Sequence, residues 1–161
     1  MVLSLVFIVT YLIPLLIIVL FKKLNLIKNY KTKSIKERKL PVALMVFLYY
    51  LLAITISNIA NLRDLGLLFY SISLALFIVY VLFFFKIKAS VHLLSLGTFM
   101  GFFMVLSNIH SKSFIIVIII LFLISGIVAS ARLTLKTHTT KEIYIGFFIG
   151  LITTSIVYFL L

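Results

Sequence analysis

The chain has 161 residues, of which 65% are hydrophobic and 11% charged, and its formal net charge is +12. A mean hydropathy of +1.36 is too high for a water-soluble domain of this size, which could not bury so much apolar surface. The sequence therefore predicts an integral membrane protein. It contains no cysteine, which excludes a disulfide framework, a thiol nucleophile and a cysteine-ligated zinc site.

Six uncharged runs have the length of roughly 20 residues that a helix needs to cross the hydrocarbon layer. We predict an all-α, polytopic protein with a single domain over residues 1–161 and six transmembrane helices in one bundle. The predicted helices cover approximately residues 2–21, 41–61, 66–85, 90–109, 114–131 and 142–161, and residues 22–40 form a basic loop.

Two prolines fall near predicted helices. Pro14 lies inside the first one, which a membrane helix tolerates when a neighbouring group satisfies the freed carbonyl. Pro41 is expected in the first turn of the second helix, where no amide donor is needed. The fifth predicted helix is apolar and β-branched, so we expect most of its surface to face lipid.

The positive charge is concentrated on one side of the predicted bundle. With six spans, thirteen of the fifteen lysines and arginines lie on the side that receives residues 22–40, 86–88 and 132–142. The positive-inside rule predicts that this side is cytoplasmic, with both termini on the other side, in a membrane such as a bacterial inner membrane. Nucleic acid is not an expected partner, because the cations gather at one lipid face.

Two of the three histidines lie on this basic side, each beside a helix with a small-residue face. His92 precedes the pattern Gly97-x3-Gly101, and His138 precedes Gly146-x3-Gly150. Such glycine pairs allow membrane helices to approach closely. The third histidine, His110, is expected to be a solvated turn residue on the opposite side.

His138 and Glu142 are four residues apart. If a helix begins near His138, the two side chains share one face. A carboxylate beside an imidazole fixes its tautomer and stabilises its cation, which prepares a histidine to act as nucleophile or base. Arg132 offers a planar set of donors suited to a phosphate. The plainer interpretation is a basic loop followed by an ordinary helix start.

Three separate segments bring such groups to the basic side. They read Lys31-x6-Arg38, Ser90-x-His92 and Arg132-x5-His138-x3-Glu142. With only three acidic residues in the whole chain, the set is poor in the oxygen ligands that a magnesium site needs. Cations can hold phosphate oxygens while one histidine attacks phosphorus and the other protonates the departing oxygen.

The three segments resemble the motifs of the type 2 phosphatidic acid phosphatase superfamily, K-x6-R-P, P-S-G-H and S-R-x5-H-x3-D. The chain departs from them at four places: Pro41 comes two residues late, Val91 stands for glycine, Ser130 comes one residue early, and Glu142 stands for aspartate. The resemblance covers roughly residues 31 to 150.

The resemblance implies a metal-independent membrane phosphatase that needs no cofactor and passes through a phosphohistidine. Its substrate would be a lipid phosphate or an isoprenyl pyrophosphate. His138 would be the nucleophile, His92 the general acid and Glu142 the residue that orients His138. The phosphate would be held by Lys31, Arg38, Ser90 and Arg132.

Two other classes of function remain open. The altered motifs favour a non-catalytic lipid-head-group binder or a small subunit of a membrane complex. A small transporter or channel would be expected to carry charged residues along its spans, which these spans lack.

Overall fold

The computed structural model describes residues 2–23, 35–59 and 61–161. This part of the chain is helical and contains no strand, so the predicted all-α class is confirmed. Its elements are α1 (Val2–Phe7), the π-helix η1 (Ile8–Leu12), α2 (Ile13–Lys23), α3 (Ile35–Ser57), α4 (Arg63–Leu82), α5 (Val91–His110), α6 (Ile115–Thr134) and α7 (Thr140–Leu160).

Within the described residues, five helices rather than the predicted six are long and apolar enough to cross a membrane. They are α3 from Glu37 onward, α4, α5, α6 and α7. This length and composition indicate an integral membrane protein.

The first predicted span is helical but interrupted by η1, and its longest α-helical piece, α2, has 11 residues. The interruption follows from Pro14, which has no amide hydrogen to donate to the Thr10 carbonyl and whose ring crowds that oxygen. A wider π turn, in which the Ile13 amide donates to Ile8, relieves the crowding.

We predicted Pro41 in the first turn of its helix, and this prediction is wrong. Helix α3 begins at Ile35, six residues earlier, so the end of the predicted basic loop is helical and Pro41 lies inside α3. Lys39 contributes to this extension because its Nζ lies 4.2 Å from the centroid of the Phe84 ring, just after α4. A cation over an aromatic face is stabilised by the ring quadrupole.

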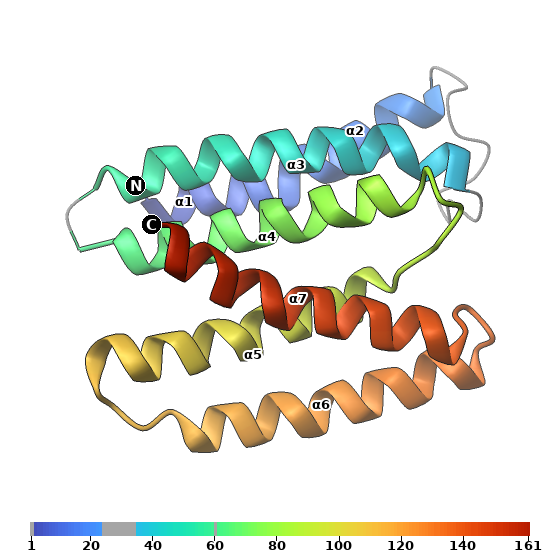
Figure 1. Cartoon of the computed structure of the whole chain (residues 1–161). Helices are drawn as coiled ribbons and strands as arrows, with labels where there is room; N and C mark the ends of the chain where they lie inside the picture. Colours follow the sequence, from blue (N-terminus) through green and yellow to red (C-terminus); the bar gives the residue numbers. More distant parts are fainter. Residues whose placement is uncertain (1, 24–34, 60) are drawn as a thin grey trace.

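Helix α4 is the centre of the bundle. It packs against α3 on one side and against α5 and α7 on the other (Figure 1). One core cluster joins Ala75, Leu76 and Val79 of α4 to Leu94 of α5. Helix α6 lies at the edge of the bundle (Figure 1). Among the described helices, its main packing partner is α5. Only Ser125 of α6 is buried, in agreement with the exposed surface predicted for this helix.

Helices α5 and α7 make the closest contact, and their glycines face each other. A Cβ added at Gly97 would lie 2.2 Å from the Phe147 carbonyl oxygen, and one at Gly150 would lie 2.1 Å from that of Leu94. The two small-residue faces therefore allow backbone contact, as predicted. This contact fixes the start of α5 against the start of α7, where the two histidines lie.

The connections alternate between two ends of the bundle. The start of α3, the 83–90 connection and the 135–139 connection lie together at one end, here called the histidine end (Figure 1). The start of α4, the end of α5 and the end of α7 lie at the other, here called the far end (Figure 1).

Candidate functional site

His138 and Glu142 form a close pair at the histidine end. The distance between His138 Nδ1 and Glu142 Oε2 is 2.7 Å, and the His138 side chain is only 7% exposed. Because an ionised carboxylate can only accept, this contact fits a ring hydrogen on Nδ1, and in the neutral imidazole the lone pair then lies on Nε2. The pairing of these two residues is as the sequence predicted.

The pairing does not arise from a shared helical face, however. Helix α7 begins at Thr140 with Thr139 as its N-cap, so His138 lies in the preceding turn. Thr139 and Glu142 form a capping box, in which the Thr139 amide also donates to Glu142 Oε2. Glu142 therefore both caps α7 and holds His138. The spacing Thr139-x-x-Glu142 is the sequence signal that could have revealed this turn.

The start of α5 is hydrogen-bonded directly to the start of α7. The Ser90 amide donates to the Glu142 carbonyl at 3.0 Å, and a Cβ at Gly146 would lie 2.5 Å from the Ser90 carbonyl oxygen. Ser90 is the N-cap residue of α5, and His92 follows in the first turn with an exposed side chain. The backbone contact thus sets where His92 stands relative to His138.

Arg132 enters from the last turn of α6. Its carbonyl accepts from both the amide and the hydroxyl of Thr137, at 3.2 and 3.1 Å, which closes the connection to α7. Lys136 in this connection has φ 50°, a left-handed conformation of the kind that ends helices. His92 interacts electrostatically with both Arg132 and His138. Two segments distant in sequence, one around His92 and the other spanning residues 132–142, therefore meet at one place.

The structure thus brings together four of the seven predicted site residues, His92, Arg132, His138 and Glu142. Ser90 adjoins them, but its side chain is fully buried, so it could not reach a phosphate in this conformation. Its hydroxyl has no hydrogen-bond partner among the residues that the structure describes. The cause of the burial is the close crossing of α7 at Gly146.

The remaining two predicted residues belong to the basic segment. Arg38 is half-buried in the first turn of α3, at the histidine end, and its role toward a phosphate stays a prediction. Lys31 lies outside the described residues. Within those residues, no group of three or more histidines and carboxylates is placed to hold a metal ion.

A second histidine–carboxylate pair, at the far end, was not predicted. His110 Nε2 lies 2.7 Å from Asp64 Oδ2, with both side chains exposed by more than two-fifths. His110 is thus solvated as expected, but it ends α5 and joins it to the first turn of α4. Both residues lie on the same side of the predicted topology, which is the signal that could have paired them.

Comparison with models of known protein families, with curated proteins and with solved structures found no match to this chain.

Proposed function

We propose that the protein is a metal-independent phosphatase that hydrolyses a lipid phosphate or an isoprenyl pyrophosphate through a phosphohistidine. The observation that carries this proposal is the His138–Glu142 pair, with its 2.7 Å contact, beside His92 and Arg132. An imidazole held by a carboxylate, a second imidazole and a guanidinium together can carry out phosphoryl transfer to a histidine.

In the first step, the His138 Nε2 lone pair attacks phosphorus and forms the N–P bond. The bond between phosphorus and the leaving oxygen breaks, and His92 donates a proton to that oxygen. Glu142 stabilises the positive charge that develops on His138 as the bond forms. Arg132 binds the equatorial oxygens, where negative charge is concentrated.

In the second step, a water molecule attacks the phosphohistidine. His92, now neutral, accepts a proton from the water, the N–P bond breaks, and its electron pair returns to His138 Nε2. Inorganic phosphate leaves, and both histidines are restored to their starting protonation states.

The substrate class follows from the position of the site. The histidine end is a terminus of helices that are long and apolar enough to cross a membrane, so the site would lie at head-group depth. A lipid could place its phosphate at Arg132 while its chain stays among the helices. We further propose that this end faces the cytoplasm of a cell with a membrane of the bacterial inner type, because thirteen of the fifteen basic residues fall on the corresponding side of the predicted topology.

One observation favours the alternative of a lipid-head-group binder without turnover. The enclosed Ser90 hydroxyl removes one of the groups expected to hold the phosphate. Such a binder, alone or as a subunit of a membrane complex, would keep Arg132 and the histidines as ligands without chemistry.

Release of inorganic phosphate from candidate lipids tests the proposal. We expect release by the purified protein in the presence of EDTA, and its loss to background in His138→Ala. His110→Ala is the matched control, because it removes a carboxylate-paired histidine at the far end and should leave release unchanged. No release from any candidate lipid by the wild type would favour the binder, and release that EDTA abolishes would reject the metal-free mechanism.

A further inference from the structure

A cavity of about 700 Å³ with both polar and apolar walls lies at the far end, away from the histidine site. Arg63 and Asp64 line it from the start of α4, Asn108 from the end of α5, and Tyr158 from the end of α7. The proposed phosphatase mechanism uses none of these residues. The cavity combines a cation, a carboxylate, an amide and a phenol within one hollow.

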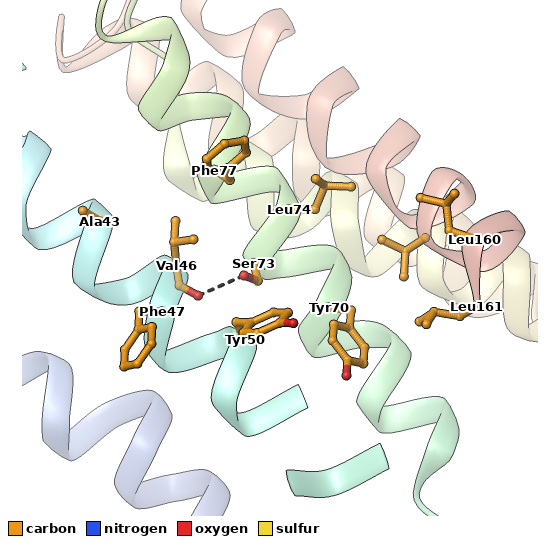
Figure 2. A pocket seen from close by; sticks show the side chains of 11 residues that line it. Ala43, Val46, Phe47, Tyr50, Tyr70, Ser73, Leu74, Phe77, Leu160 and Leu161 are labelled. Carbon is orange, nitrogen blue, oxygen red and sulfur yellow. Dashed lines mark hydrogen bonds between the residues drawn. The ribbon is translucent and has the colours of Figure 1, made fainter. Parts of the chain in front are cut away.

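An apolar groove of about 470 Å³ adjoins this cavity. Figure 2 shows side chains that line it from α3, from α4 and from the end of α7, among them Phe47, Phe77 and Leu160. The Ser73 hydroxyl donates to the Val46 carbonyl at 2.9 Å, so it is already satisfied and does not require a polar ligand. Tyr70 and Leu161 line both the groove and the cavity, so the two spaces are neighbours.

The cavity is lined by one cationic side chain, Arg63, and one carboxylate, Asp64, whereas the histidine end is rich in cations. Arg63 and Asp64 are neighbours, and on this side of the predicted topology the only other lysine or arginine is Lys112. Asp64 Oδ2 is engaged by His110, but a carboxylate has a second oxygen that can accept hydrogen bonds. A ligand that carries one negative and one positive group close together matches this pair.

We propose that the cavity and the groove bind one phospholipid with a zwitterionic phosphoethanolamine head group. Arg63 binds the phosphate and Asp64 accepts hydrogen bonds from the primary ammonium. One acyl chain occupies the apolar groove lined by α3, α4 and the end of α7, and Tyr70 lies at the junction of head and chain. The place of the cavity, at the end of helices long enough to cross a membrane, is the depth of a lipid head group.

Native mass spectrometry of the purified chain with equal amounts of phosphatidylethanolamine, phosphatidylcholine and phosphatidylglycerol tests the head-group assignment. We expect about tenfold tighter binding of phosphatidylethanolamine than of phosphatidylcholine, because choline has no N–H to donate to Asp64. Asp64→Asn should remove this preference, and Arg63→Gln should weaken both lipids. Equal binding of the two lipids by the wild type, or a preference for phosphatidylglycerol, would overturn the assignment.

A groove-filling variant tests the chain site separately and does not alter the Asp64–His110 pair. Ala43 lines the groove from α3, so Ala43→Phe should lower binding of phosphatidylethanolamine and phosphatidylcholine about tenfold. Ala131→Phe, at an exposed position of α6, is the size-matched control and should bind as the wild type does. Unchanged binding in Ala43→Phe would refute the groove. Because neither the cavity nor the groove is lined by His138, His138→Ala should still bind phosphatidylethanolamine whether or not the phosphatase proposal holds.

Discussion

Glu142 has two tasks that ordinary mutagenesis would confuse. It completes the capping box of α7 with Thr139, and it holds His138 at 2.7 Å. Glutamine also serves in a capping box, but its amide carries no charge. The substitution Glu142→Gln therefore separates the structural task from the chemical one.

We predict that Glu142→Gln lowers kcat about 100-fold and changes KM much less. The neutral amide cannot stabilise the positive charge on His138, and its NH₂ group can donate to Nδ1, which favours the tautomer that has a hydrogen on Nε2. Steady-state phosphate release at several lipid concentrations measures both constants. Equal changes in kcat and KM would contradict the orienting role.

Glu142→Ala provides the contrasting case, since alanine can neither cap the helix nor hold the imidazole. We expect it to lower both kcat and the free energy of unfolding, the latter by about 0.5–2 kcal/mol. Thermal unfolding in detergent measures the loss. If Glu142→Gln unfolds at a temperature as low as that of Glu142→Ala, the capping box depends on the charge of Glu142.

At this scale the sequence predicted the partners but not their conformation. The spacing from His138 to Glu142 suggested a contact, which the structure realises through a helix cap instead of a helix face. The burial of Ser90 was not predictable, because it depends on how closely α7 crosses α5 at Gly146. That distance is a property of the packed pair of helices rather than of the local sequence.

Among the elements, the α5–α7 pair determines the geometry of the site. Each of its four glycines faces the backbone of the other helix, so an added methyl group would force the pair apart. The patterns in the sequence predicted smooth faces on both helices. They could not show that these faces meet each other, because glycine pairs are common in membrane helices.

We predict that Gly150→Ala lowers the free energy of unfolding by about 1–3 kcal/mol and reduces phosphate release. The new Cβ would lie 2.1 Å from the Leu94 carbonyl oxygen, so α5 and its His92 would have to move. Gly126→Ala in α6 is the matched control, because apart from its chain neighbours and the adjacent backbone of its own helix no heavy atom of the described residues lies within 4 Å of the Cβ it would add. Alanine should be neutral there or stabilise α6 by about 0.5–1 kcal/mol. Equal destabilisation by the two variants would contradict the proposed role of the α5–α7 contact.

The first predicted span shows where counting apolar residues fails. Residues 2–21 have the composition of a crossing helix, but Pro14 converts one turn into η1. The sequence revealed the proline without revealing how the chain would accommodate it. A π turn, a kink and a satisfied carbonyl are all available responses to a proline in a membrane helix.

On the scale of the whole molecule, the two ends of the bundle differ in charge and in chemistry. The histidine end carries His92, Arg132 and the His138–Glu142 pair, whereas the far end carries the His110–Asp64 pair and the neighbouring Arg63. The bundle architecture was predictable from hydropathy, because each long apolar run must satisfy its backbone internally as a helix. The far-end cavities were not, since they arise from spaces left between packed helices.

We predict that the histidine end faces the cytoplasm. The absence of native cysteine allows single cysteines at two exposed positions, Lys141→Cys at the histidine end and Lys112→Cys beyond α5. In cells, a membrane-impermeant thiol reagent should label position 112 and should reach position 141 only after the membrane is opened. The reverse pattern would place the site outside and would contradict the charge argument.

The central claim is that His138 becomes phosphorylated during turnover, and trapping the intermediate tests it most directly. Purified protein is mixed with a lipid labelled in its phosphate, quenched with alkaline denaturant within one turnover, and analysed by peptide mass spectrometry. We predict label on His138 in the wild type and in His110→Ala, and none in His138→Ala. Phosphate release without label on His138, or label that persists elsewhere in His138→Ala, would contradict the account.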